Sequence, residues 1–433
     1  MSHQTRPPAA RVRTRREFLA EGSVSLAALA GAGGLLSACS NSTSAGPSSA
    51  GSGAGGQPTG PGGLPLPRPD HPVTLPRWED PIESGLQPET GGEFIVFNYA
   101  DYIYPKILKD FGKKYGVTVR VEPFDNITSA MTILASGSIH PDVMNLTIDH
   151  LEQAVAAKLI KPINLDYVPN LKRNVWPSLV SPYYDVGSRY TVPYTVTATG
   201  IYWRTDKVSE DIASMSNPWD MFWQSSAYSG EVTVLDEVRE TIAMALLHAG
   251  DLDINTEDPA KIDSAVADLQ KLYSICNVRT LDTQWQKIPE GKAFLSLAWS
   301  GDPLASVFYD LKTPSEANLL RFWWPGKGKG PTANDTFAVC STTNKPVLGH
   351  LFLNYLVDNG VAYSNFVDFN GYQPPLNEID PHALVQKGLI PETLQNTVLT
   401  ETDIGPTSIQ ECPLTVAGQA LWQDGFSKFQ SGA

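Results

Sequence analysis

The sequence contains few of the residues that most often carry catalysis or hold metal ions. Its 433 residues include four cysteines and seven histidines, and no Cys-x-x-Cys or His-x-x-x-His spacing occurs among them, which gives no support to a metal site. The segment WSGDP (residues 299–303) is not a Gly-x-Ser-x-Gly nucleophile elbow, and GKGKG (residues 326–330) lacks the spacing and the following Ser or Thr of a phosphate-binding loop. The residues therefore predict no catalytic group, no cofactor and no metal.

Positive charge and long apolar runs are also scarce. The chain has 32 Lys and Arg against 46 Asp and Glu, a formal net charge of −14. An acidic surface disfavours nucleic acid as a partner and favours cationic ligands. The apolar run over residues 27–36 is too short and too rich in glycine for a transmembrane span.

The first 39 residues are typical of an export signal. The segment TRREFL (residues 14–19) contains twin arginines, and the apolar run leads to LSAC, which ends at Cys39. This pattern resembles a twin-arginine lipoprotein signal, in which the cysteine receives a lipid and becomes the new N-terminus. Cleavage before Cys39 would leave 27 basic and 44 acidic residues, a net charge of −17. We expect the mature chain to be anchored by this lipid to the outer face of the cell membrane.

The composition then changes along the chain. Residues 40–67 are mostly Ser, Gly, Ala and Pro, and predict a disordered tether because they offer too little apolar surface to bury. Residues 68–91 contain several prolines and Trp78, and predict an irregular extension that packs on the body. The remaining ~340 residues are too many for a single core, so two lobes are expected.

Strand and helix patterns alternate beyond residue 92. The segments EFIVF (residues 93–97), VTVRVEPF (residues 117–124), PDVMNL (residues 141–146) and GEVTVL (residues 230–235) predict strands. Helical spacing of apolar residues follows over residues 103–115, 150–160 and 236–250. This alternation predicts α/β layering, in which ligands bind beyond the carboxyl ends of the strands.

Acidic and aromatic side chains cluster where these strands end, and again in the later segments LSLAWSGD (residues 295–302) and TANDTFAV (residues 332–339). A carboxylate at the start of a helix can simply cap free N–H groups, but capping needs no neighbouring Tyr or Trp. Glu237 and Glu240 also lie three residues apart, which places both on one face of the predicted helix. The residues concerned are Tyr99, Asp101, Tyr102, Thr147, Asp149, Glu237, Glu240, Trp299, Asp302 and Asp335.

Six segments, taken in order, resemble the periplasmic spermidine/putrescine-binding proteins of ABC transporters. They are FNYADYIYP, PDVMNLTID, VPYTVTATGIYW, LDEVRETIAMAL, LAWSGD and FNGYQPPLN, and the similarity runs from about residue 93 to the C-terminus. The resemblance implies a two-lobed periplasmic-binding-protein fold, each lobe a mixed sheet flanked by helices, with hinge crossovers between them. The expected N-terminal lobe comprises residues 92–198 and 333–380, and the C-terminal lobe comprises residues 199–332 and 381–433.

The resemblance also implies function and partners. A monomer would close on a linear polyamine and deliver it to a membrane permease driven by a separate ATPase. An acidic pair would hold an ammonium group, a tryptophan ring would lie beneath the methylene chain, and an acid and a tyrosine would come from the other lobe. The matching ligand-binding positions are Tyr99, Asp101, Tyr102, Thr147, Glu237, Glu240, Trp299, Asp302, Asp335 and Tyr372.

Two positions depart from the family pattern. Ala333 stands where the family commonly has an aromatic residue, and Asp149 replaces a residue that is usually not acidic. We therefore include Asp149 among the expected ligand-binding residues, in a site with less ring surface and more charge than usual. A protein that binds a sugar or another small cation remains an alternative, as does a carboxylate-dependent glycosidase.

The energetics of burying charge favour a cationic ligand at such a site. Helix N-termini attract anions, so a site of this kind needs explicit carboxylates to hold an ammonium group. A buried ammonium is costly unless it is paired, and aromatic faces and buried methylene groups add further stabilisation. Outside the site, Tyr104 is expected to pack in the core, and His140 and His150 are interpreted as structural or surface residues. Cys276, Cys340 and Cys412 leave two alternatives open, one disulfide or three buried thiols.

Overall fold

The computed structural model describes residues 58–309, 311, 314–326, 328–404 and 408–432. These residues belong to one compact unit. The expected signal with Cys39, and the expected tether up to residue 57, lie outside them. In the part of the chain that is described, no helix combines the length and the apolar character that a membrane span requires.

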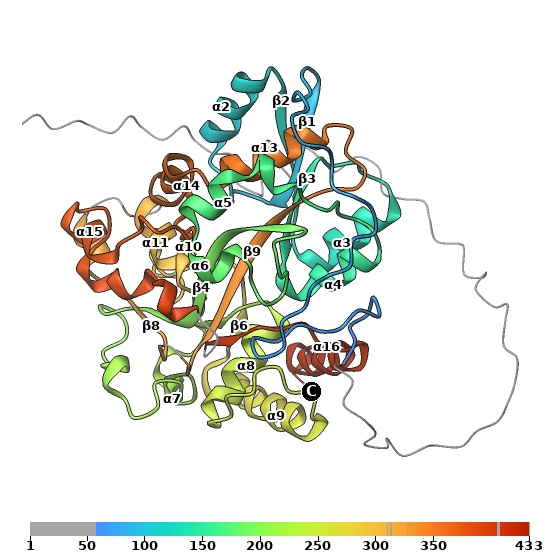
Figure 1. The fold of residues 1–433 in the computed structure, drawn as a ribbon. Helices are drawn as coiled ribbons and strands as arrows, with labels where there is room; N and C mark the ends of the chain where they lie inside the picture. Colours follow the sequence, from blue (N-terminus) through green and yellow to red (C-terminus); the bar gives the residue numbers. More distant parts are fainter. Residues whose placement is uncertain (1–57, 310, 312–313, 327, 405–407, 433) are drawn as a thin grey trace, which may run out of the picture. The chain divides into compact units, whose positions relative to one another are not determined.

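A mixed sheet runs through the middle of the molecule, with helices on both sides (Figure 1). Its first three strands are parallel neighbours and match three of the predicted strands. The strand order is β2-β1-β3-β9-β4-β7-β5-β6, with β8 beside β4 and β10 beside β9. The strands are β1 (Glu93–Tyr99), β2 (Thr118–Phe124), β3 (Val143–Thr147), β4 (Thr191–Arg204), β5 (Val232–Val234), β6 (Arg279–Thr280), β7 (Leu295–Trp299), β8 (Leu320–Trp323), β9 (Pro331–Val339) and β10 (Ile409–Gln410). The expected α/β class with a mixed sheet is confirmed.

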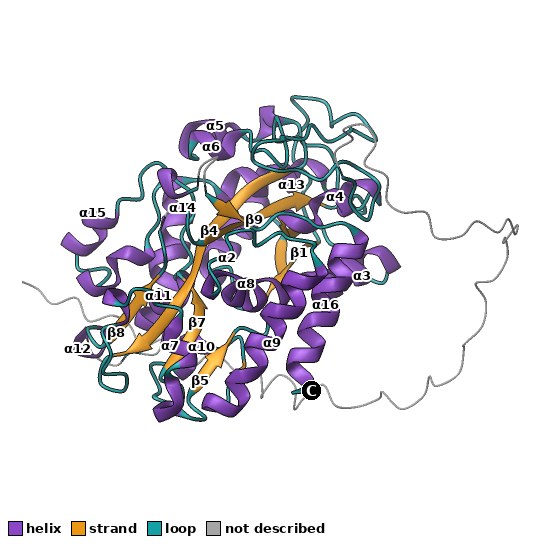
Figure 2. Cartoon of the chain, turned by 90° about the horizontal axis from the view of Figure 1, so that it is seen from below, coloured by secondary structure: helices purple, strands orange, loops and turns teal. Residues whose placement is uncertain are grey.

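Two long antiparallel strands, β4 and β9, connect the two ends of this sheet (Figure 2). The first part of β4, up to Ala198, is bonded to β9, whereas its continuation from Thr199 is bonded to β7 and β8. Gly200 lies just after this change of partners, where an added Cβ would come within 2.1 Å of the carbonyl oxygen of Trp323. Only glycine allows the two backbones to approach so closely.

Helices cover both faces of the sheet. α2 (Pro105–Tyr115) begins at a proline, whose missing N–H is no loss in the first turn, and ends at Gly116 in the left-handed conformation. The longer helices α8 (Val238–His248), α9 (Pro259–Cys276) and α16 (Val416–Ser431) pack together over β5 and β7, with α16 alongside α9 (Figure 2). The other helices are α3 (Ile127–Ser136), α4 (Ile148–Ala156), α5 (Pro169–Asn174), α6 (Pro177–Val180), α7 (Asp220–Trp223), α10 (Gln284–Lys287), α11 (Gly301–Tyr309), α12 (Pro314–Ala317), α13 (Pro346–Leu356), α14 (Asn359–Asn365) and α15 (Pro381–Gln386).

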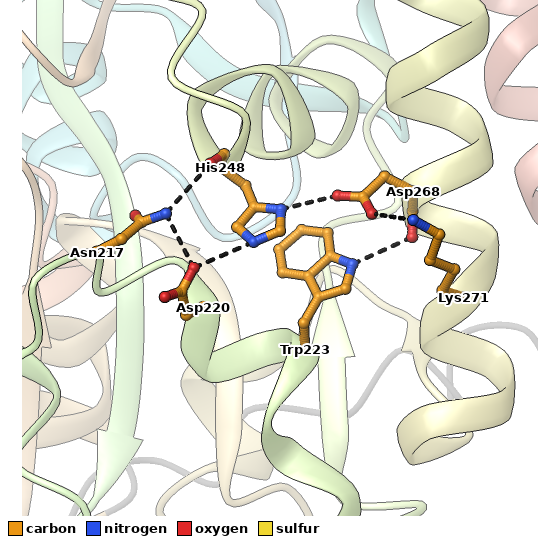
Figure 3. Close-up of polar contacts among 6 residues, drawn as sticks. All are labelled: Asn217, Asp220, Trp223, His248, Asp268 and Lys271. Carbon is orange, nitrogen blue, oxygen red and sulfur yellow. Dashed lines mark hydrogen bonds and ion pairs between the residues drawn. The ribbon is translucent and has the colours of Figure 1, made fainter.

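The far end of α8 is fixed by a polar cluster around His248 (Figure 3). The two ring nitrogens of His248 face carboxylate oxygens of Asp220 and Asp268, at 3.2 and 2.7 Å. Its ring also stacks on Trp223, with centroids 3.7 Å apart and planes inclined by 8°. Lys271 donates to the other oxygen of Asp268 at 2.9 Å. These contacts join α7, α8 and α9, and so hold α8 in place from its C-terminal end.

The ordered body begins before the boundary that the sequence predicted. Residues 58–67, expected in the tether, pack against α4, and Leu66 is fully buried. The backbone N–H groups of Gly62 and Leu64 donate to the carboxylate of Glu152, which is itself buried. Further along the extension, the indole of Trp78 donates to the backbone of the body. The composition of residues 58–67 could not reveal this packing, because their partner Glu152 in α4 lies about 90 residues away in the chain.

The three cysteines of the described body are free thiols. Cys276, Cys340 and Cys412 are all buried and do not pair with one another. Burial raises the pKa of each thiol, which keeps the reactive thiolate form rare. Of the two alternatives that the sequence left open, the structure therefore has three buried thiols.

Candidate ligand-binding site

The strand register brings several predicted residues to one level of the sheet. Tyr99 is the last residue of β1, and Thr147 is the last residue of β3. Asp335 of β9 lies directly opposite Thr147, and it also faces Thr195 across the β9–β4 ladder. Trp299, at the end of β7, lies opposite β4 four residues further along. At the usual rise of a strand, these four residues displace the level of Trp299 from that of Asp335 by roughly 13 Å along β4.

Asp335 is held by Tyr102, in a group of aromatic rings. The Tyr102 hydroxyl donates to Oδ2 of Asp335 at 2.7 Å and lies 2.6 Å from the hydroxyl of Thr195. The ring of Tyr102 makes edge-to-face contacts with Tyr99 and Tyr372, at centroid distances of 5.9 and 5.4 Å. Burial raises the pKa of Asp335 to about 6, although the hydrogen bond from Tyr102 opposes this shift. A cationic partner would stabilise the ionised form of a carboxyl group in such surroundings.

Asp149 has a counter-ion that the sequence did not reveal. Nδ1 of His150 lies 3.1 Å from Oδ1 of Asp149, and both side chains are largely buried. Burial disfavours the charge on Asp149, but the attraction to His150 and hydrogen bonds from His150 and Thr147 outweigh it and lower its pKa. Burial likewise opposes the charge on His150, and the attraction to Asp149 outweighs it and raises the pKa of the ring. His150 thus has a structural partner that the sequence did not reveal, and His140 is exposed, as its interpretation as a surface residue predicts.

Glu237 and Glu240 begin α8 but do not both serve as caps. Glu237 occupies the N-cap position and makes no side-chain capping bond. Glu240 accepts a hydrogen bond of 3.0 Å from the indole nitrogen of Trp299, which ties the acid to the ring. Burial raises the pKa of both acids, and the charge of Glu240 raises that of Glu237 further. The capping explanation for this pair is thus insufficient.

Tyr99 lies within electrostatic reach of four acids from three different segments. Burial raises the pKa of its hydroxyl well above the usual value, and repulsion from nearby carboxylates raises it further. These carboxylates belong to Asp335, Glu237, Asp149 and Glu240. The charges of predicted acids from β9, α4 and α8 therefore all act on this one tyrosine.

Two predicted acids do not join this group. Asp302 is fully buried, and its carboxylate accepts hydrogen bonds from Tyr372, Gln284 and the backbone of Trp299. Burial raises the pKa of Asp302 to about 6 despite these bonds. Its oxygens are thus used inside the protein, where they hold the hydroxyl of Tyr372 and the backbone of Trp299. Asp101 is exposed in a left-handed turn with φ of 56°, and the partial burial of its carboxyl group raises its pKa.

The remaining predicted residues have structural partners. Tyr372 donates to Asp302 at 2.7 Å and covers Gly301, where an added Cβ would lie 2.6 Å from the ring. Tyr104 stacks on Phe369 with centroids 5.2 Å apart, which fits the packing role expected for it. A separate hollow of about 700 Å³, lined by Trp203, Phe322 and Glu392 among others, contains none of the predicted ligand-binding residues.

One acid of the group was missed by sequence reasoning. Glu411 follows β10, and its carboxyl group is affected by the charges of Glu240 and Asp149. Burial, followed by repulsion from Glu240, raises its pKa well above the usual value. No motif or periodic segment surrounds Glu411 in the sequence, so only the fold reveals its position.

The fold and this group of acids and rings define a solute-binding protein. A family model described as bacterial extracellular solute-binding protein matches residues 106–391. The chain belongs to this family.

Known relatives agree with this assignment over most of the chain. The spermidine/putrescine-binding periplasmic protein of Escherichia coli K12 is 24% identical over 359 residues, which cover 81% of this chain and 94% of that protein. The solved spermidine/putrescine ABC transporter substrate-binding protein from Streptococcus pneumoniae has a TM-score of 0.60 at 19% identity, covering 79% of this chain and 99% of that one. The TpPotD lipoprotein of Treponema pallidum has a TM-score of 0.62 at 16% identity, with coverages of 78% and 99%. At these identities the solved structures support the fold.

Proposed function

We propose that this chain is the substrate-binding protein of an ABC importer and that it captures a linear polyamine of the spermidine/putrescine class. The observation that carries the proposal is the set of contacts between acids and rings: Tyr102 donates to Asp335 and packs edge-to-face on Tyr99, and Trp299 donates to Glu240. The charges of these two acids, and those of Asp149 and Glu237, also act on Tyr99. The name of the Escherichia coli relative, a spermidine/putrescine-binding protein, supports the same class of ligand. A membrane permease and a separate ATPase are the partners that such an importer requires.

The electrostatics favour an extended, multiply charged cation. In the part of the chain that is described, the carboxylate of Glu237 has no hydrogen bond or ion pair, and that of Glu240 is bonded to Trp299 alone among side chains. Partly buried carboxylates without counter-ions are costly, and ammonium groups would offset this cost. Methylene groups between the amines would pack on Tyr99, Tyr102 and Trp299, and ring faces attract the ammonium groups as well.

Binding is proposed to close two lobes around the ligand. The change of partners in β4 after Ala198 supports the expected boundary between residues 198 and 199. Asp335 would belong to the N-terminal lobe, and Glu237 and Glu240 to the C-terminal lobe. A polyamine that bridges these acids stabilises the closed form by its differential affinity for that form.

Attachment to the membrane is proposed through a lipid on Cys39. The twin arginines, the apolar run and the LSAC segment support it, and one solved relative is described as a lipoprotein. In cells that express the full chain, the wild-type protein should fractionate with membranes, and the Cys39→Ala variant should not be recovered as a lipidated membrane species. Equal membrane recovery of both proteins would exclude this anchor.

A thermal-shift screen of the purified chain tests the function directly. Spermidine or putrescine at about 100 times the dissociation constant should stabilise the fold by roughly 2.7 kcal/mol and raise the melting temperature by several degrees. Glucose, maltose and amino acids serve as the matched panel and should leave it unchanged. A rise with a sugar alone would favour the alternative of a sugar-binding protein.

A further inference from the structure

His150, in the first turn of α4, is held by oxygen atoms from three segments. Its Nδ1 lies 3.1 Å from Oδ1 of Asp149 and 3.3 Å from Oγ1 of Thr147, at the end of β3. Its Nε2 lies 3.4 Å from Oγ1 of Thr128 in α3. The side chain is 13% exposed. Both ring nitrogens therefore face oxygen atoms, which suits an imidazolium because that form donates from both nitrogens.

Asp149 is the acid that the other groups of the proposed site have in common. These groups are Tyr99 at the end of β1, Glu237 and Glu240 at the start of α8, and Asp335 in β9. Burial raises the pKa of each of them, and the charge of Asp149 raises it further. An ammonium group bound among these acids would therefore also be attracted by Asp149.

Among the described residues, one acid sustains the positive charge on His150. Burial opposes this charge, but the attraction to Asp149 and the hydrogen bond to it outweigh burial and raise the pKa of the ring. Arg239, in the first turn of α8, also acts on the ring, and its repulsion favours the neutral form. From α3 the ring meets the uncharged hydroxyl of Thr128. If a ligand cation offset the charge of Asp149, burial and Arg239 would both favour loss of the proton.

We propose that protonated His150 is a built-in counter-ion of the unliganded site, and that it releases a proton when an ammonium group of the ligand binds near Asp149. The inference rests on the proposed polyamine function and adds a coupling between binding and pH. His150 is a positioning residue in this scheme, because it acts on the ligand through Asp149. Since binding releases a proton, the affinity rises with pH over the range in which His150 titrates.

The proton release leaves the two side chains in place. The N–H bond at Nε2 breaks, and its proton passes to the buffer. The ring keeps the proton on Nδ1 and still donates it to Asp149, while the hydroxyl of Thr128 turns to donate to Nε2. The ligand brings one positive charge to Asp149 and the ring gives one up, so the net charge around Asp149 is unchanged.

Nuclear magnetic resonance of the purified full chain, labelled with 13C at the histidine Cε1 atoms, tests the proton release directly. His150→Gln identifies the signal of His150 by its absence. In the unliganded chain the midpoint of its titration should lie above the ordinary value of 6.5, and saturating spermidine should lower it by about one pH unit or more. The exposed His140 is the control within the same spectra and should titrate equally with and without spermidine. A midpoint of His150 that spermidine leaves unchanged would overturn the inference.

Calorimetry provides a second readout that a purely structural role of His150 would not move. In buffers of different ionisation enthalpy, spermidine should release more protons from the wild type than from His150→Gln, since the carboxyl groups of the site contribute to both. At pH 7 the variant should bind spermidine about threefold to tenfold more tightly than the wild type, and the difference should shrink by pH 8.5 as the wild-type ring loses its proton. His140→Gln is the matched control and should behave as the wild type.

The outcomes separate this inference from the function on which it rests. Equal proton release by the wild type and His150→Gln, or a loss of affinity that is the same at both pH values, would overturn the inference and leave the polyamine function intact. His150→Asn, which is also neutral and carries an amide, replaces His150→Gln if that variant does not fold. Absence of spermidine binding to the wild type would overturn the function and the inference together.

Discussion

Glu237→Gln and Asp335→Asn are each expected to weaken spermidine binding by more than tenfold while the fold is retained. Each change replaces a carboxylate by an amide of nearly equal size, so the shape of the site is kept and one negative charge is lost. A charge-assisted hydrogen bond to an ammonium group contributes about 1.5 to 3 kcal/mol, which corresponds to roughly tenfold or more in affinity. Titration calorimetry on the purified variants measures the effect.

Retention of the fold can be checked on the same samples. The pKa values of both acids are raised, so the unliganded fold is relieved of a buried charge when either is replaced. We therefore expect melting temperatures equal to or above that of the wild type. Glu392→Gln, which removes one exposed carboxylate from the separate hollow, provides a charge-matched control. Wild-type affinity in both site variants would show that these acids do not contact the ligand.

Spermidine affinity is expected to rise by about tenfold or more between pH 5 and pH 7. The pKa of Asp335 is about 6, so its ionised fraction grows from about one-tenth to about nine-tenths over this interval. The pKa values of Glu237 and Glu240 are raised as well, and these groups steepen the dependence. Alkylamines with pKa values near 10 stay charged throughout, so the change comes from the protein. Calorimetric dissociation constants at five pH values would measure the slope.

The Asp335→Asn variant separates the contribution of this one acid. Without its titration, the variant should show a shallower rise of affinity between pH 5 and pH 6 than the wild type. A spermidine affinity that is flat with pH in the wild type would contradict the raised carboxyl pKa values.

The folding stability of the unliganded chain should fall as the pH rises, whereas the affinity for spermidine should increase. In the folded state the pKa of Asp335 is about 6, against an ordinary value of 3.8, so between these values the folded state binds more protons than the unfolded state. The stabilisation from this group is complete below about pH 4 and is lost as the pH rises through about 6. Spermidine should consequently raise the melting temperature more at pH 7.5 than at pH 5.

The elements that present the site were predictable because their patterns are local. Alternation over residues 93–97 and 141–146 marks β1 and β3, and helical spacing after residue 236 marks α8. Residues at the ends of these strands could therefore be named as neighbours before the structure was known. Asp335 was also named from its local segment, but its place beside Thr147 and Thr195 could not be read there, since β9 joins β3 and β4 across long distances in the chain.

Three features of the site could not be read from the sequence. Glu411 depends on a two-residue strand, β10, that is too short to produce a pattern. The bonds that enclose Asp302 come from residues 18 and 70 positions away, so its role inside the protein follows only from tertiary contacts. The pairing of His150 with Asp149 depends on side-chain orientation in the first turn of α4, which adjacency in the sequence does not determine.

The cluster around His248 affects the rate at which the proposed ligand would associate. Because Asp220, Asp268 and Trp223 fix one end of α8, the helix backbone that carries Glu237 and Glu240 is held in place without a ligand. The helix would therefore lose little conformational entropy when a ligand binds. Less of the binding free energy would be offset by ordering of the protein. For the proposed polyamine, the negative charge of the site would then mainly raise the association rate by electrostatic steering at low ionic strength.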